Sequence, residues 1–206
     1  GVTAPRAGSL PVGVLASGSG TNLQALLDAP DVDVVAVASD KPGAGALGRA
    51  RAAGVPAAVF PRDDFGDRSA RDAAVADWLG ERGVGLVVLA GYMQLVSPAF
   101  LAAFPQRVIN VHPALLPAFP GIDAVGQALD YGAKVTGVTV HFVDEGVDTG
   151  PIILQRALDV GDAADRETLH DRLRPLEHEL LPEAVRLIAA GRVAFDAANQ
   201  RRVIVS

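Results

Sequence analysis

The stretch Arg107-Val-Ile-Asn-Val-His-Pro-Ala-Leu-Leu-Pro-Ala-Phe-Pro-Gly121 ends one sequence pattern and begins another. Its apolar start predicts a buried strand over Arg107–Val111. Asn110 and His112 stand two residues apart, so in an extended strand their side chains point to the same face. Pro113 disfavours helix at His112 and keeps the backbone extended. Such a pair is either a satisfied polar pair at a strand end or a site for acyl transfer, which needs an oxyanion donor and a proton carrier.

Before this stretch, apolar runs alternate with amphipathic segments. The expected strands are Leu10–Ala16, Val32–Ser39, Ala57–Phe60 and Gly85–Ala90. The expected helices are Asn22–Asp28, Ala46–Ala53, Asp67–Arg82 and Pro98–Phe104. The strands are rich in valine and nearly continuously apolar, as in strands covered on both faces. The alternation predicts an α/β fold with a doubly wound, mostly parallel sheet.

After this stretch the pattern changes to paired strands and a long helix. A helix is expected over Ile122–Tyr131, followed by two long strands that pair in antiparallel fashion. These strands are Lys134–Val143 and Ile152–Val160. The helical stretch Asp165–Ala190 contains Pro175 and Pro182, which predict a kink or a break. Arg201–Val205 is expected to form a last edge strand.

Composition excludes several classes of protein. The chain has 206 residues, 50% of them hydrophobic and 20% charged, which excludes disorder. A net charge of -6 makes a nucleic acid an unsuitable partner. Without cysteine there is neither a disulfide nor a thiolate metal site, which fits a cytoplasmic protein. The apolar run Gly83–Val96 is too short and interrupted to cross a membrane, and Gly1–Ser9 has no signal-peptide core.

The loop Ser17-Gly-Ser-Gly-Thr-Asn22 follows the first strand and opens a helix. Its glycines let backbone N–H groups point at an anion, and the helix dipole favours a phosphate there. The alternative is a tight turn capped by Thr21 or Asn22. A dinucleotide site is a further alternative, with Asp40 as its ribose-binding acid. Leu23, however, occupies the place of the third glycine that this fingerprint requires.

An acidic loop lies within Thr139–Pro151. Asp144, Glu145 and Asp148 are either solvated turn residues, ligands of a divalent cation without a fixed calcium-loop spacing, or carboxylates aimed at His112. Asp148 is preferred for the last role because the following Thr-Gly-Pro turn holds it rigidly. His141 is expected in the core or behind the site.

Several of these segments follow strands of the predicted sheet. Ligands of such sheets bind at the carboxyl ends of the strands. We therefore expect three segments to share one rim: Ser17–Thr21, Tyr92–Gln94 and Asn110–Pro113.

Together these motifs resemble the glycinamide ribonucleotide formyltransferase family, the folate-dependent enzymes of purine synthesis. The matching segments are Ser17–Asn22, Ala90–Gln94, Asn110–Pro117 and Thr139–Pro151. The resemblance runs in order from about Val12 to Leu187. It implies one formyltransferase domain over 1–206, with a phosphate-binding half at about 10–105 and a catalytic, folate-binding half at about 106–190.

The resemblance implies the reaction and a role for each matched residue. The formyl group of 10-formyltetrahydrofolate passes to the amine of glycinamide ribonucleotide, without a metal. The implied catalytic residues are Asn110, His112 and Asp148. The residues implied to bind the ribonucleotide phosphate and ribose are Gly20, Thr21, Asn22 and Glu177. The residues implied to bind folate are Arg68, Tyr92, Met93, Gln94, Leu95 and Asn110.

Three positions depart from the family pattern. Asp123 stands where a histidine often follows the Pro-Gly turn, and Gln94 replaces a basic residue common after the methionine. Pro175 precedes Glu177 and affects how its side chain is oriented. The expected partners are the two small substrates, with no nucleic acid and no membrane, and the chain is expected to be a monomer or homodimer.

Three rival functions remain. Methionyl-tRNA formyltransferase is expected to add a C-terminal tRNA-binding domain, and the acidic net charge of -6 does not suit tRNA. Formyltetrahydrofolate deformylase hydrolyses the same folate, but it resembles this chain with an added N-terminal regulatory domain. A non-enzymatic nucleotide-binding module would use the glycine-rich loop without requiring Asn110, His112 and Asp148 to converge.

Overall fold

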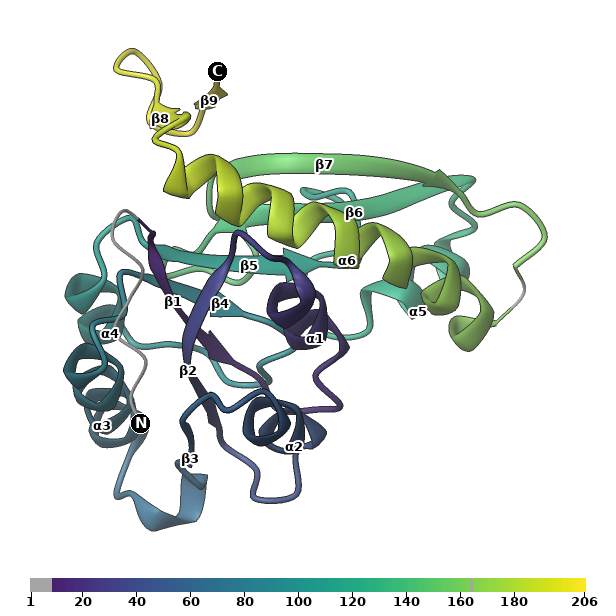
Figure 1. Cartoon of the computed structure of the whole chain (residues 1–206). Coiled ribbons are helices and arrows are strands. Elements are labelled where there is room, and N and C mark those ends of the chain that lie inside the picture. The colour runs from purple at the N-terminus through teal and green to yellow at the C-terminus, as the bar shows by residue number, and fades with distance from the viewer. Residues whose placement is uncertain (1–8, 164) are drawn as a thin grey trace. The chain divides into compact units, whose positions relative to one another are not determined.

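The computed structural model describes residues 9–163 and 165–206 (Figure 1). The sequence predicts no signal-peptide core in Gly1–Ser9, and residues 1–8 of that segment lie outside the described residues. The chain forms two compact units, the first ending at Ile109 and the second beginning at Asn110, and each is described by itself. Among the helices of the described residues, none combines the length and apolar character needed to cross a membrane.

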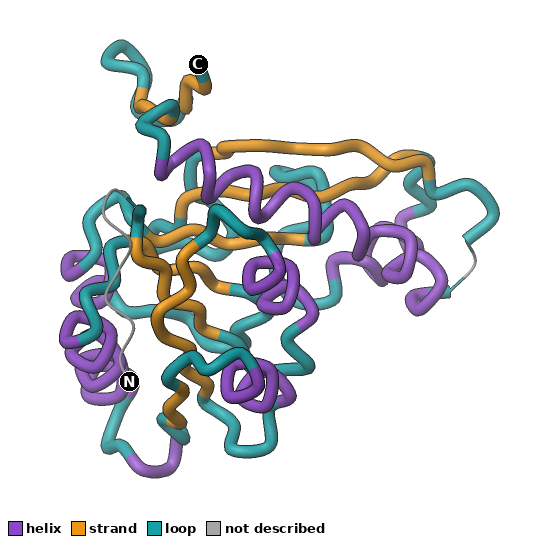
Figure 2. Tube along the Cα trace, in the orientation of Figure 1, coloured by secondary structure: helices purple, strands orange, loops and turns teal. Residues whose placement is uncertain are grey.

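The first unit alternates strands and helices (Figure 2). Its strands are β1 (Pro11–Leu15), β2 (Asp33–Ser39), β3 (Ala57–Val59) and β4 (Leu86–Leu89). Its helices are α1 (Thr21–Asp28), α2 (Gly45–Ala52), α3 (Arg68–Glu81) and α4 (Pro98–Ala103), with a 3₁₀ turn, η1, at Arg62–Asp64. β1 pairs in parallel with both β2 and β4, and β2 pairs in parallel with β3. This is the alternation that the sequence predicts.

The core of the first unit lies on both faces of its strands. All four residues of β4 are buried, as are Val12–Leu15 in β1. In Figure 1, α1 and α2 lie on one side of these strands, and α3 and α4 lie on the other. Coverage on both faces explains why the strands read as continuous apolar runs instead of alternating ones.

The second unit opens within β5 and is built on a long antiparallel pair. Its elements are β5 (Val108–His112), α5 (Ala124–Tyr131), β6 (Val135–Phe142), β7 (Ile152–Asp159), α6 (Arg166–Ala189), β8 (Val193–Phe195) and β9 (Val203–Val205). β6 and β7 pair in antiparallel fashion, as predicted, and α6 packs against both. β8 and β9 form a separate antiparallel hairpin. The hydrogen-bonded strand order is β3-β2-β1-β4-β5-β6-β7, which confirms the predicted fold class.

Helix α6 differs from its prediction, since it runs unbroken through Pro175 and Pro182. Each proline removes one N–H donor from the helix. Pro175 is exposed, so water can solvate the carbonyl that it leaves without a donor. Around Pro182 a continuous apolar face holds the helix together by packing. β8, a three-residue strand, was also absent from the prediction.

Candidate active site

Asn110 and His112 both lie on β5, and the loop that follows them is tied to β6 and β7. Thr139 Oγ1 donates to the Ala114 carbonyl at 2.7 Å and accepts from the Leu116 N–H at 3.2 Å. Gln155 Nε2 donates to the Leu116 carbonyl at 2.9 Å. The chain leaving His112 is therefore held at successive points, and the imidazole, 6% exposed, sits at a fixed position.

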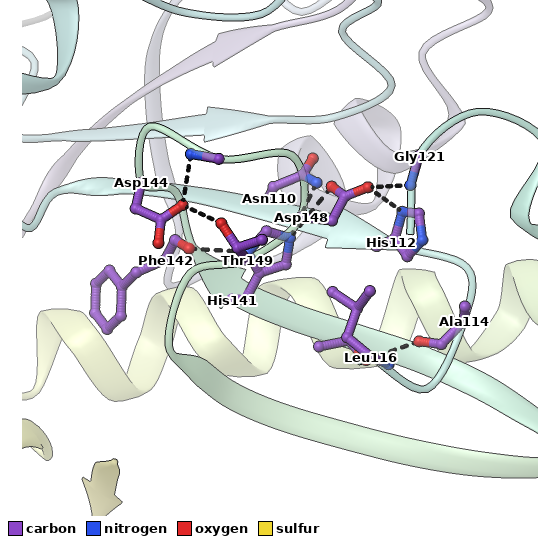
Figure 3. Close-up of polar contacts among 12 residues, drawn as sticks. Asn110, His112, Ala114, Leu116, Gly121, His141, Phe142, Asp144, Asp148 and Thr149 are labelled. Atoms are coloured by element: carbon purple, nitrogen blue, oxygen red, sulfur yellow. Dashed lines mark hydrogen bonds and ion pairs between the residues drawn. The ribbon is translucent and has the colours of Figure 1, made fainter. Parts of the chain in front are cut away.

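Asp148 faces His112 from the loop between β6 and β7 (Figure 3). Its Oδ2 lies 3.5 Å from His112 Nδ1 and accepts from the Gly121 N–H at 2.7 Å. Asp148 has a φ of 54°, a left-handed conformation that aspartate tolerates better than most residues. Gly150 allows this turn, because a Cβ there would lie 1.6 Å from the Phe142 carbonyl oxygen.

Both ring nitrogens of His112 face oxygen atoms. Its Nε2 lies 2.9 Å from the Phe119 carbonyl oxygen, which only accepts hydrogen bonds, so Nε2 carries a proton. A neutral ring would then point a bare Nδ1 at the Asp148 carboxylate. An imidazolium places an N–H toward both oxygen atoms and attracts the carboxylate. This arrangement suits a group that gives away a proton.

His141, on β6, links Asn110 to Asp148. Its Nδ1 lies 2.8 Å from the Phe142 carbonyl oxygen and therefore donates. Burial lowers the pKa of His141, so the ring is neutral and its Nε2 accepts from Asn110 Nδ2 at 3.2 Å. Asp148 Oδ1 lies 3.8 Å from the same Nε2. Asn110 must therefore turn its amide nitrogen to this side, and that nitrogen keeps a second N–H for another acceptor.

The other acids of the loop do not face His112. Asp144 Oδ1 accepts from the Gly146 N–H at 3.0 Å and from Thr149 Oγ1 at 2.6 Å, so this carboxylate shapes the turn. Glu145 is exposed. Of the three acids considered from the sequence, Asp148 is the one beside the imidazole, and the structure brings Asn110, His112 and Asp148 together through His141.

In the first unit, the glycine-rich loop leaves the start of α1 open. The N-cap is Gly20, with a φ of 79° and no side-chain capping bond, so the predicted alternative of a cap by Thr21 or Asn22 is wrong. The first N–H groups of a helix then lack partners and suit an anion. Arg49 Nε donates to the Ser19 carbonyl at 2.7 Å and steadies the loop from α2. Asn22 Oδ1 is buried without a partner in the described part of the chain.

Asp40 is engaged inside the first unit. Its side chain accepts hydrogen bonds from Ser17 and from Gln94, and the residue is 6% exposed. Leu23 is fully buried in the core. The dinucleotide alternative therefore loses both the free acid and the glycine that it requires.

The residues predicted to bind folate differ in exposure. Met93 and Leu95 are 61% and 56% exposed, whereas Gln94 between them bonds to Asp40 and Arg71. Burial raises the pKa of Tyr92 to about 12, so its phenol stays neutral. The remaining members are Arg68, exposed at the start of α3, and Asn110, described above in the second unit.

Glu177 points into the buried face of α6. It shares that face with Leu169, Leu173 and Leu181, and it is 5% exposed. Its carboxylate lies 3.7 Å from His170 Nε2 on the same helix. Because α6 continues through Pro175, the orientation of Glu177 is set by helical periodicity. The described contacts pair this acid with His170 and not with Asn110, His112 or Asp148.

Asp123 has a structural role. It is the N-cap of α5, where its Oδ1 accepts from the Gly126 N–H at 3.1 Å. Arg166 Nε donates to its Oδ2 at 2.8 Å, and this bond holds the pKa of Asp123 below its usual value. A Cβ at position 126 would lie 2.2 Å from that carboxylate. The residue that departs from the family pattern thus joins α5 to α6.

A family model described as formyl transferase matches residues 11–185, which is most of the chain. The chain therefore belongs to the formyl transferase family. The resemblance inferred from the motifs is confirmed.

Relatives within that family carry a more particular name. The chain is 42% identical over 178 residues to the phosphoribosylglycinamide formyltransferase of Bacillus subtilis, covering 84% of this chain and 91% of that one. It is 47% identical over 180 residues to the enzyme of that name from Mycobacterium tuberculosis, covering 85% and 83%. The crystal structure of glycinamide ribonucleotide transformylase 1 from Symbiobacterium toebii superposes with a TM-score of 0.93 at 49% identity, covering 97% and 95%.

Proposed function

We propose that this chain transfers the formyl group of 10-formyltetrahydrofolate to the amine of glycinamide ribonucleotide, a step of purine biosynthesis. One observation carries the proposal: a hydrogen-bond donor, two imidazoles and a carboxylate converge at Asn110, His112, His141 and Asp148. Relatives that match along most of their length are phosphoribosylglycinamide formyltransferases, which supports these two substrates.

The reaction exchanges one carbon–nitrogen bond for another. The amine nitrogen forms a bond to the formyl carbon, and the bond between that carbon and N10 of the folate breaks. One proton leaves the amine and one proton is added to N10. Negative charge develops on the formyl oxygen between these events, so the reaction needs a donor for that oxygen and a proton carrier.

Each member of the cluster then has a role. The free N–H of Asn110 donates to the developing oxyanion, a bond worth roughly 3 kcal/mol in comparable sites. The imidazolium of His112 supplies the proton. Asp148 stabilises that imidazolium and takes part in passing protons through water.

Binding is assigned to residues outside this cluster. Gly20, Thr21 and Asn22, with the open start of α1, hold the phosphate of the ribonucleotide. Glu177 contacts its ribose. The exposed side chains of Met93 and Leu95 offer an apolar surface for the folate, beside Tyr92, Gln94 and Arg68.

The test is a formyl-transfer assay with 10-formyltetrahydrofolate, run with and without glycinamide ribonucleotide. Formylated product formed only when the ribonucleotide is present supports the transferase. Loss of the formyl group at the same rate without the ribonucleotide would show a hydrolase and overturn the proposal.

The role of Asp148 is tested by Asp148→Asn, which keeps the shape of the side chain and removes its charge. Turnover should fall by about 100- to 10,000-fold, the range for losing assisted proton transfer, with a smaller change in KM. The matched control is Glu145→Gln, a charge removed from an exposed position of the same loop. Near-normal turnover of the Asp148 variant would remove Asp148 from the mechanism.

A further inference from the structure

A network of hydrogen-bonded polar groups supports the loop that follows β4, within the first unit. Ser17 Oγ donates to Asp40 Oδ1 at 2.6 Å, and Gln94 Nε2 donates to the other oxygen of that carboxylate at 2.8 Å. Arg71 Nη1 donates to Gln94 Oε1 at 3.2 Å. Ser17, Asp40 and Arg71 are buried. This hydrogen-bonded network therefore joins the end of β1, the end of β2 and helix α3 to Gln94.

The orientation of the Gln94 amide is fixed by its two neighbours. A carboxylate such as Asp40 only accepts hydrogen bonds, and a guanidinium such as Arg71 only donates them. The amide nitrogen must then face Asp40 and the amide oxygen must face Arg71. Both ends of this side chain are used inside the protein, which suits a residue that shapes the loop better than one that contacts a ligand.

The same network fixes the backbone of the loop. The Met93 N–H donates to Ser17 Oγ at 2.9 Å, so the hydroxyl that donates to Asp40 also holds this peptide. With Gln94 turned inward, the side chains on either side of it, Met93 and Leu95, turn outward into solvent. An alternating arrangement of this kind is what an extended segment requires.

Arg71 brings a positive charge to this hydrogen-bonded network from the buried side of the loop. Its side chain is 3% exposed, its Nη2 lies 3.7 Å from Asp72, and its Nε has no partner among the described residues. A guanidinium buried this way costs stability, so packing alone does not account for it.

We propose that Ser17, Asp40, Gln94 and Arg71 form a positioning network that holds Met93 and Leu95 in the arrangement that binds the folate, with the buried guanidinium of Arg71 fixing the orientation of Gln94. This inference rests on the proposed function, because it assumes a folate at that loop. An arginine introduced at 94 would meet Arg71 in a poorly solvated place, where like charges repel strongly. Moving the guanidinium from 71 to 94 removes that conflict.

The test compares the parent with Gln94→Arg, Arg71→Gln and the double variant that exchanges the two residues. Gln94→Arg should raise KM for 10-formyltetrahydrofolate by about tenfold, the size expected for two coupled neighbours, and leave KM for the ribonucleotide within about twofold. The double variant should recover most of that loss. Arg82→Gln is the matched control, since it removes an arginine from the C-cap of the same helix, where the side chain packs on Trp78.

Gln94→Met, which keeps the length of the side chain and removes both hydrogen bonds, serves if Gln94→Arg does not fold. It should raise KM for the folate about threefold with little change for the ribonucleotide. Equal increases in both KM values, or a double variant no better than Gln94→Arg, would overturn the inference. A parent without formyl transfer would instead overturn the proposed function, and calorimetric binding of tetrahydrofolate to the same variants would then judge the network by itself.

Discussion

His141, which is 2% exposed, determines the orientation of the Asn110 amide. Its Nδ1 is committed to the Phe142 carbonyl, so its Nε2 must accept, and the amide must present nitrogen and not oxygen. A protonated His141 would offer an N–H to the same amide. Asn110 would then turn its oxygen to this side, and its donor would move away. The neutral state of one buried ring therefore fixes the orientation that the proposed oxyanion donor requires.

This neutral state has a consequence for stability. Because burial lowers the pKa of His141, the unfolded chain takes up a proton near the ordinary value of about 6.5 while the folded chain does not. The unfolded state then binds more protons below about pH 6.5. The free energy of unfolding should be fully retained above that pH and should fall as the pH drops toward the folded pKa, by at most about 1.4 kcal/mol per pH unit from this residue.

Urea unfolding of the parent and of His141→Gln at about pH 7.5 and about pH 5.5 measures this effect. The glutamine cannot titrate, so the variant should lose less stability between the two conditions. His170→Gln, which removes a partly exposed imidazole, is the matched control. Identical losses in the parent and in His141→Gln would contradict the assignment of the slope to His141.

The pairing of Asn110 with His112 was predictable because two residues on one strand share a face by simple alternation. The place of His141 between Asn110 and Asp148 was not. It depends on how β6 lies beside the end of β5, and no local pattern carries that register. The sequence indicated that His141 lies in the core or behind the site, but it did not indicate the hydrogen bond between His141 and Asn110.

At the scale of elements, α2 supports the glycine-rich loop Ser17–Asn22 from outside it. The Ala46 N–H donates to the Gly18 carbonyl at 3.1 Å, and a Cβ at Gly20 would lie 2.6 Å from Ala46 Cα. Gly20 also has a positive φ, which costs other residues about 1–2 kcal/mol. The close approach of α2 and the left-handed turn both require glycine.

Gly20→Ala should therefore push the loop and α2 apart. We expect KM for the ribonucleotide to rise by about tenfold, equivalent to 1.4 kcal/mol, with KM for the folate nearly unchanged. Gly48→Ala is the matched control, because this glycine lies inside α2 facing open space and alanine should stabilise the helix by about 1 kcal/mol. Steady-state kinetics with each substrate varied in turn separate the two effects, and an equal loss for both substrates would contradict the assignment.

Helix α6 places an acid where its periodicity calls for an apolar residue. Glu177 occupies the same face as three buried leucines, and a carboxylate buried there costs free energy unless it is well paired. Its partner is His170 at 3.7 Å, a weak pairing. A position that lowers stability fits a residue kept for contact with a substrate.

Glu177→Leu should raise the thermal midpoint by about 2–4 °C, as a gain of about 1 kcal/mol predicts for a chain of this size, while KM for the ribonucleotide rises. Glu177→Gln, which keeps the polar group, is the control for charge alone. Differential scanning calorimetry and kinetics on the same preparations measure both. A leucine variant that is less stable and binds the ribonucleotide normally would make Glu177 an ordinary core residue.

At the scale of the whole molecule, the fold was easier to predict than the contacts. Valine-rich runs such as β2 and β4 specify buried strands by composition alone, and the order of strands and helices implies the parallel topology. α6 was predicted with a kink or break because local rules for Pro175 and Pro182 ignore the packing of a long apolar face. The predicted common rim for the three post-strand segments stays a prediction, as does the single domain over 1–206.

The hairpin β8–β9 affects the tendency of the folded protein to aggregate at high concentration. β7 is the last strand in the hydrogen-bonded order, and such a strand presents free N–H and C=O groups to any other chain. The hairpin reaches it through a parallel bridge between Ile152 and Arg202, and Phe195 stacks on Phe142 with ring centroids 4.9 Å apart. Phe195→Asp should loosen this cover and increase light scattering at high protein concentration. Ile204→Asp, at an exposed position of the same hairpin, should leave scattering as in the parent. The β8–β9 hairpin thus covers part of the edge strand β7 and limits edge-to-edge aggregation between molecules.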